Sequence, residues 1–329
     1  MTTRTTAPGA RLCQVALSVT DLRRSVDWYG RALGFQPAGT IRHVATDGPA
    51  RVPGLPECSL DVWCVVDRQE WMQFEIMEFE RPRTRRLPAD WHPSDIGYST
   101  IGLHVEDFDK ALERLTRTSG RLLTDPIGNP GERRVCLRDP DGVLLELMED
   151  DVRASEPRSR PHEQIPATVR SVTVSVPSLE RARRFWVDGL GCAEASVRLH
   201  HPDHERLWGL EGGRRESLAL WAGDVLIELV CYQSPAWRAR PAGYLISDQG
   251  ILNVAFGCPS RAALQATYVR LVRLGFRPNT GPWAVPGRAT VVYFTDDQGF
   301  SVELLYVEPE GMEYMGFVPQ PPGPTRDTR

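Results

Sequence analysis

The sequence lacks long apolar stretches, paired cysteine motifs and a strong net charge. No segment of its 329 residues approaches the ~20 apolar residues of a membrane span, and Thr2 to Arg11 contain no apolar leader. Its seven cysteines are odd in number and never spaced as C-x-x-C, so we expect reduced core residues. A net charge of −4 favours neither nucleic acid nor an anionic membrane surface. These absences predict a cytoplasmic protein without either partner.

Motifs for nucleotide binding and for serine nucleophiles are missing as well. The sequence contains no Gly-rich phosphate loop and no Gly-x-Ser-x-Gly, so we expect no nucleotide or flavin cofactor. A composition of 41% hydrophobic and 25% charged residues is that of an ordinary globular protein, long enough for two domains.

Buried-looking glutamates are the most informative feature that is present. Each lies between apolar neighbours in a strand-like run, and they recur once per structural unit: Glu75, Glu146, Glu228 and Glu303. Taking an ionised carboxylate out of water costs several kcal/mol unless a cation, a proton or hydrogen bonds compensate it. The repetition indicates a shared purpose for these carboxylates.

The periodicity predicts four βαβββ modules. Each opens with an alternating strand and a capped amphipathic helix, such as the helix after Asp21 that ends near Gly34, and continues with shorter strands. The fold class is therefore α+β. The modules run from Leu12 to Phe79, Tyr98 to Glu149, Thr168 to Tyr232 and Gly250 to Val307. We expect residues 1–11 to be flexible, 151–167 to form a linker and 309–329 to be a disordered Pro-rich tail.

The strand–helix opening Val15 to Leu22 and the Asp-Pro-Asp-Gly turn from Asp139 to Gly142, whose glycine lies four residues before Glu146, resemble the vicinal oxygen chelate superfamily. Its members include glyoxalases, epimerases, extradiol dioxygenases and bleomycin-resistance proteins. The resemblance implies two tandem cupped half-barrels, with the first two modules in a domain at 12–150 and the last two in a domain at 168–308.

The resemblance also implies where a metal would bind, because the family takes one ligand from the first strand and one from the last strand of each paired module. In the N-terminal half-barrel the matching positions are Gln14, Glu75, Thr100 and Glu146. Such oxygen donors suit a divalent ion such as Mg²⁺ or Mn²⁺, and Zn²⁺ or Ni²⁺ are further candidates. The matching positions of a second pocket are Ser171, Glu228, Asn253 and Glu303. Neither set supplies the two histidines of an extradiol dioxygenase.

Histidines and arginines outside these positions receive weaker interpretations. His92 and His104 are candidates for the rim of the pocket. The segment around His200, His201 and His204 is interpreted as a partly exposed loop that serves as a lid. The arginine cluster at residues 81–86 is interpreted as a solvated or interface segment, with steering of an anionic substrate as the alternative.

The function that fits these features best is a metal-assisted isomerase, epimerase or lyase acting on a small oxygenated metabolite. Glu75 and Glu146 would act as ligand and base through an enolate-like intermediate. Two alternatives stay open: a drug-sequestering binding protein, and a metal-free enzyme whose paired glutamates share a proton. A homodimer is a further possibility.

Overall fold

The computed structural model describes residues 10–44, 54–55, 57–118, 120–153 and 161–320, and within them the four βαβββ modules are confirmed. Module one comprises β1 (Arg11–Val19), α1 (Leu22–Leu33), β2 (Gln36–Val44), β3 (Ser59–Val66) and β4 (Gln73–Arg81). Module two comprises β5 (Gly97–Val105), α2 (Phe108–Arg117), β6 (Arg121–Leu122), β7 (Arg134–Arg138) and β8 (Leu144–Met148).

The second half of the chain repeats this order with local additions. Module three comprises β9 (Ala167–Ser175), α3 (Leu179–Arg183), the π-helix η2 (Arg184–Gly189), β10 (Ala193–Glu194), the 3-10 helix η3 (Pro202–Trp208), β11 (Arg214–Ala222) and β12 (Val225–Ser234). Module four comprises β13 (Gly250–Gly257), α4 (Arg261–Arg273), β14 (Arg277–Pro278), β15 (Trp283–Val285), β16 (Ala289–Thr295), β17 (Ser301–Val307) and the 3-10 turn η4 (Pro309–Gly311).

The modules pair differently from the expectation. Sheet one has the order β14-β16-β17-β13-β1-β4-β3-β2, so it combines modules one and four, and β15 adds to it beside β16. Sheet two has the order β10-β11-β12-β9-β5-β8-β7-β6 and combines modules two and three. The prediction that modules one and two share a half-barrel at 12–150, and modules three and four another at 168–308, is therefore wrong in its strand pairing.

The physical reason lies in the first strands and the connections between modules. Each first strand has one edge free for a partner, and the four strands carry the same apolar pattern, so the pattern does not select the partner. In the structure β1 pairs antiparallel with β13 and β5 with β9. Residues 82–96 and 235–249, which precede β5 and β13, carry the chain from one sheet to the other.

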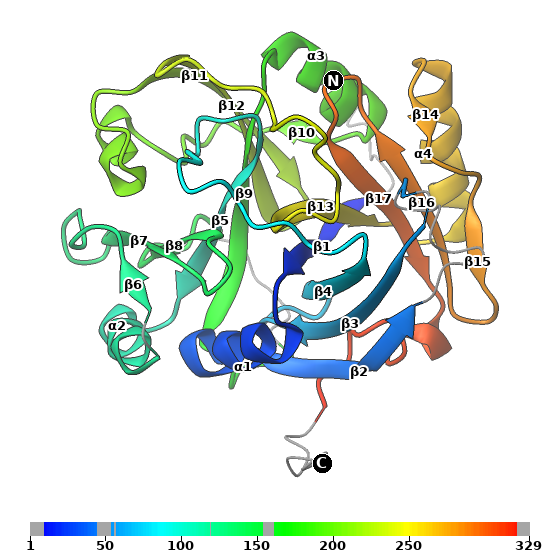
Figure 1. Cartoon of the computed structure of the whole chain (residues 1–329), viewed down its shortest axis with the longest axis horizontal. Coiled ribbons are helices and arrows are strands. Elements are labelled where there is room, and N and C mark those ends of the chain that lie inside the picture. Colours follow the sequence, from blue (N-terminus) through cyan, green and yellow to red (C-terminus); the bar gives the residue numbers. More distant parts are fainter. Residues whose placement is uncertain (1–9, 45–53, 56, 119, 154–160, 321–329) are drawn as a thin grey trace, which may run out of the picture.

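Modules one and two contact through their helices instead, as do modules three and four. Helices α1 and α2 lie side by side below the sheets (Figure 1), and Arg114 Nε donates a hydrogen bond to Ala32 O over 3.3 Å. Arg270 Nε on α4 donates similarly to Gly189 O at the end of η2 over 2.6 Å. One large apolar cluster joins the helices to the inward faces of both sheets.

The Asp-Pro-Asp-Gly turn of module two is bound to the start of α1. Asp141 accepts hydrogen bonds from Thr20 N and from Ser25 Oγ, at 3.0 and 2.6 Å, and Asp139 accepts one from Tyr29 Oη at 2.8 Å. Burial and the neighbouring Asp141 raise the pKa of Asp139 to about 7. A motif expected to close a hairpin therefore also joins two modules.

Three further expectations can be compared with the described residues. Six of the cysteines are buried, Cys231 is half-buried and none forms a disulfide. None of the helices in the described ranges is long and apolar enough to cross a bilayer. Residues 309–320 are ordered and the bridge between Ala38 and Pro319 fixes their end, so the expectation of a disordered tail is wrong for that part. The expectation for residues 1–9 and 321–329 lies outside the described residues.

Candidate functional site

The structure divides the predicted ligands into two sets that differ from the expected ones. Sheet one brings together Gln14, Glu75, Asn253 and Glu303, because Ala16 is paired with Glu75 and with Asn253, and Ala255 with Glu303. Sheet two brings together Thr100, Glu146, Ser171 and Glu228. The predicted site of Gln14, Glu75, Thr100 and Glu146 is therefore wrong as one set, as is the second pocket, because modules one and two belong to different sheets.

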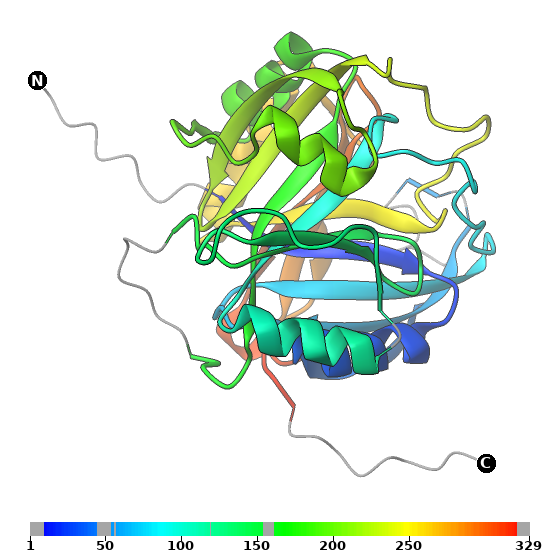
Figure 2. The same cartoon turned by 90° about the vertical axis from the view of Figure 1, so that its left-hand side faces the viewer.

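In sheet two a histidine fills the space between the two glutamates. His200 Nε2 lies 2.7 Å from Glu146 Oε2, and His200 Nδ1 lies 2.6 Å from Glu228 Oε2. The side chain of His200 is completely buried, and its ring packs edge-on against Trp208 with 4.8 Å between ring centroids. Figure 2 shows η3, which begins two residues after His200, lying across this sheet.

Two arginines neutralise the remaining negative charge of the buried glutamates in sheet two. Arg134 Nη1 binds Glu146 Oε1 at 3.0 Å, and Arg215 Nη1 lies 3.2 Å from Glu228 Oε1. Arg215 also pairs with the buried Glu205. Three buried carboxylates thus face three buried cations, and the carboxylates have no need of a bound ion.

The pKa values follow from this arrangement. The opposing charge and hydrogen bonds of His200 outweigh burial and lower the pKa of both Glu146 and Glu228 to about 2. Although burial opposes its charge, the two glutamates raise the pKa of His200 to about 9. The histidine is therefore a cation at neutral pH, and the predicted exposed position of His200 is wrong.

In sheet one no such cation lies between the glutamates. Gln14 Nε2 donates hydrogen bonds to Glu75 Oε2 at 2.9 Å and to Glu303 Oε2 at 3.3 Å, so the two carboxylates converge on one amide nitrogen. Gln73 Nε2 donates to Gln14 Oε1 over 2.8 Å and fixes the orientation of that amide. The nearest ion-pair partner in the described residues is Arg42, whose Nη2 is 3.9 Å from Glu75 Oε1.

Both carboxylates of the pair have raised pKa values. Burial and the charge of Glu75 raise the pKa of Glu303 to about 8, which exceeds the lowering by Tyr293, Gln14 and Arg42. Burial also raises the pKa of Glu75, against the opposing effect of Arg42. At neutral pH the pair therefore holds a proton in the absence of an additional cation.

Buried amide atoms without partners lie in the same place. Asn253 is completely buried, and neither its Nδ2 nor its Oδ1 has a hydrogen-bond partner of ordinary geometry among the described residues, although Tyr293 lies close enough to interact with it; Gln73 Oε1 also lacks a partner. Orphaned buried polar atoms are uncommon in folded proteins and call for a ligand, an ion or a water molecule.

Two apolar clusters flank the polar set. On one side are residues that include Cys13, Tyr293 and Phe317, and on the other side residues that include Ala16, Phe79 and Leu252. The ordered C-terminal segment contributes to the first cluster: Phe317 stacks on Trp71 with 4.3 Å between ring centroids. The segment approaches so closely that a side chain at Gly316, whose φ is 81°, would collide with Cys64.

The predicted rim histidines lie away from this polar set. His104 is on β5 in sheet two, where its Nε2 lies 3.6 Å from Glu106 Oε1. His92 is exposed in the loop before β5, and its backbone N–H donates to Asp95 Oδ2 over 2.9 Å. The role assigned to Glu146 also changes, because His200 and Arg134 occupy both of its carboxylate oxygens.

The donor set of sheet one fits a divalent cation. The described residues contain no cluster of three or more His, Cys, Asp or Glu side chains suited to a metal, so an ion would depend on the two amides as well. Two carboxylates and two amides are hard oxygen donors, which suit Mg²⁺ or Mn²⁺. The mutual repulsion of Glu75 and Glu303 and the orphaned Asn253 amide are the features that an ion would relieve.

Comparison with known proteins agrees with the fold. Residues 11–147 match the model of the Glyoxalase/Bleomycin resistance protein/Dioxygenase superfamily. Glyoxalase I from Zea mays is similar in structure with a TM-score of 0.59 at 18% identity, covering 90% of this chain and 92% of that one. A putative dioxygenase from Bacillus subtilis gives a TM-score of 0.60 at 12% identity, covering 95% and 88%. No curated protein matches the sequence.

The family model thus relates residues 11–147, which hold modules one and two, to the superfamily that the sequence motifs resemble. The structural likeness extends over modules three and four, beyond the residues that the family model matches, but at such low identities it establishes the fold alone.

Proposed function

We propose that the polar set of sheet one is the active site of an enzyme that moves a proton on a small oxygenated metabolite with the help of a divalent cation. The reaction class would be that of an isomerase, epimerase or lyase. The observation that carries the proposal is the convergence of the buried carboxylates of Glu75 and Glu303 on Gln14 Nε2 without a matching cation. The equivalent glutamates of sheet two are neutralised by His200 and two arginines.

The residues would act as follows. The carboxylates of Glu75 and Glu303 and the amide oxygen of Asn253 would hold the cation, and the Gln14 amide would have to turn to present Oε1 in place of Nε2. When bound, the cation supplies Lewis-acid stabilisation of negative charge on adjacent substrate oxygens. Glu75 and Glu303 together can hold or release one proton near neutral pH, because burial raises the pKa of both and the charge of Glu75 further raises that of Glu303. The flanking apolar clusters exclude water and strengthen these interactions.

Glu303 thus takes the place that sequence reasoning gave to Glu146. A metal-free acid–base enzyme would use the same carboxylate pair, and a binding protein would use the same apolar walls. The cytoplasmic location and the homodimer stay predictions.

Proton exchange tests the proposal without knowledge of the substrate. Protein purified without added metal is analysed for bound metal, then incubated in D₂O with small hydroxyketones and Mg²⁺ or Zn²⁺, and deuterium incorporation is followed by NMR. We expect cation-dependent exchange at the carbon next to the carbonyl, reduced about 10²-fold or more in Glu303→Gln and in Glu75→Gln. Glu132→Gln removes an exposed carboxylate in a turn and should leave exchange unchanged.

The possible results of this experiment distinguish the metal-assisted enzyme from the metal-free enzyme and from the binding protein. Exchange without any metal requirement would support the metal-free enzyme, and ligand binding without exchange would support the binding protein. Less than about a tenth of an equivalent of bound metal, with no exchange after adding Mn²⁺, Mg²⁺, Zn²⁺ or Ni²⁺, would refute the metal-assisted enzyme.

A further inference from the structure

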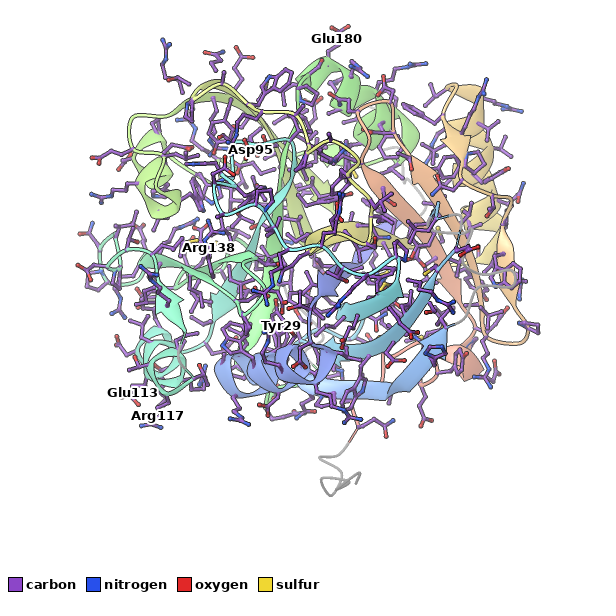
Figure 3. The ribbon with its side chains drawn as sticks, in the orientation of Figure 1. Tyr29, Asp95, Glu113, Arg117, Arg138 and Glu180 are labelled. Carbon is purple, nitrogen blue, oxygen red and sulfur yellow. The ribbon has the colours of Figure 1, made fainter. Side chains whose placement is uncertain are left out.

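The two loops that connect the sheets are copies of one sequence motif. Residues 85–97 and 238–250 both read Arg-x-x-Pro-Ala, then an aromatic residue, then Ser-Asp-x-Gly, with a constant offset such that Arg85 corresponds to Arg238 and Asp95 to Asp248. Asp95 is labelled in Figure 3, in the loop before β5. The loops therefore repeat the internal symmetry of the modules.

The two loops are joined by ion pairs between the repeated residues. Arg85 binds both carboxylate oxygens of Asp248, at 2.7 and 2.6 Å, and Arg238 binds both oxygens of Asp95 at 2.7 Å. Arg238 also pairs with Asp90 at 2.6 Å. These reciprocal pairs engage each of the carboxylates that line the space between the loops.

A cavity of about 450 Å³ lies between the clasped loops, a size typical of small-molecule sites. Its walls are mostly apolar and aromatic, and they include Trp91, Tyr98, Val143, Tyr244 and Ile251. These residues are separate from the polar set of sheet one, so the cavity is a second candidate site.

The symmetry between the loops is broken by the charge at one position inside the cavity, besides differences at its edge. Leu87 in the first loop corresponds to Arg240 in the second, and both side chains lie against the glycine of the neighbouring turn, Gly142 or Gly299. The guanidinium of Arg240 lies over the rings of Phe300 and Tyr244, at 4.5 and 5.1 Å from their centroids.

The guanidinium of Arg240 is not paired with a carboxylate of the described residues. Arg240 Nη1 donates a hydrogen bond to Gln298 O over 3.3 Å, and no ion pair within 4.0 Å joins Arg240 to a described carboxylate. Burial raises the pKa of Asp296 to about 6, and the nearby charge of Arg240 opposes this shift without a direct ion pair; Asp296 Oδ1 accepts from the backbone amides of Gln298 and Phe300, and Oδ2 has no hydrogen-bond partner among the described residues. Arg86, exposed at the edge of the cavity, adds a second positive charge.

We propose that this cavity binds a small aromatic carboxylate. The aromatic body would lie against Trp91 and Tyr98, and the carboxylate would pair with Arg240, with Arg86 attracting it at the edge. The reciprocal ion pairs between the two loops fix the walls of the cavity before the ligand binds. The site is independent of the function proposed for sheet one.

Isothermal titration calorimetry with 2-naphthoate tests the proposal on the full chain. We expect one site with a Kd below about 1 mM, and binding at least about tenfold weaker for the neutral analogue 2-naphthalenemethanol and for inorganic phosphate. Arg240→Leu installs the residue that the symmetric position already carries, so it should fold normally and lose about tenfold or more in affinity.

Two control variants locate the binding. Arg273→Leu makes the same chemical change on an exposed position of α4, and Glu303→Gln alters sheet one, and both should bind 2-naphthoate like the wild type. Equal affinity for the acid, the alcohol and phosphate, unchanged binding in Arg240→Leu, or no detectable heat at about 5 mM ligand would each overturn the proposal.

Discussion

Replacing His200 with alanine is expected to destabilise the protein by about 3–5 kcal/mol, because it leaves the completely buried carboxylates of Glu146 and Glu228 without their shared cation. Urea denaturation at pH 6.5, near the ordinary pKa of histidine, measures the loss. The arginines on the other carboxylate oxygens stay in place, so the difference reports the histidine itself.

His200→Gln is the matched control for this prediction. Glutamine can keep hydrogen bonds to both glutamates but carries no charge, so its free energy of unfolding should lie between those of the wild type and the alanine variant. A loss below about 1 kcal/mol in His200→Ala would contradict the buried charge network.

The network also predicts a dependence of stability on pH. Since folding raises the pKa of His200 from 6.5 to about 9, its contribution is complete below pH 6.5 and is lost as pH rises through 9, a change of about 3 kcal/mol. Folding lowers the pKa of Glu146 and Glu228 from 4.5 to about 2, so their contribution is present above pH 4.5 and is lost towards pH 2. The difference in stability between the wild type and His200→Gln should therefore be largest between pH 4.5 and 6.5 and should shrink as pH rises towards 9, as measured by urea unfolding curves across this range.

Glu303→Gln is expected to have the opposite effect in metal-free buffer: it should stabilise the protein at alkaline pH. Folding raises the pKa of Glu303 from 4.5 to about 8, so the folded protein resists ionisation and loses stability as pH rises from 4.5 to 8. Glutamine has the shape of the protonated acid and does not ionise. The variant should therefore match the wild type near pH 4.5 and exceed it by roughly 2–5 kcal/mol above pH 8, measured by urea denaturation with EDTA.

A divalent cation should reverse this difference. An ion at about 100 times its Kd stabilises the wild type by about 2.7 kcal/mol, whereas Glu303→Gln lacks one of the two carboxylates that would hold it. Identical pH profiles of wild type and variant without metal would show that Glu303 is not held in the repulsive pair with Glu75.

Much of the architecture follows from the sequence because its signals are local. Alternating apolar residues, an aspartate or serine before each helix and the turn motifs specify the βαβββ module wherever it occurs. The same periodicity places a glutamate on each last strand, and Gln14 and Asn253 on first strands that bring them into one set with Glu75 and Glu303. The repeated Arg-Asp motif of the connecting loops was equally readable from the sequence, as copies at a constant offset.

The sequence by itself thus determined four modules and the polar positions on their strands. Only the tertiary structure decided which modules share a sheet, because four first strands with the same pattern and a free edge are equivalent partners until the connecting loops place them. It also decided that His200, from a loop far from Glu146 in sequence, neutralises one pair of glutamates and leaves the other pair to repel. Such charge balance depends on through-space distances of a few ångströms, which a local pattern of residues does not encode.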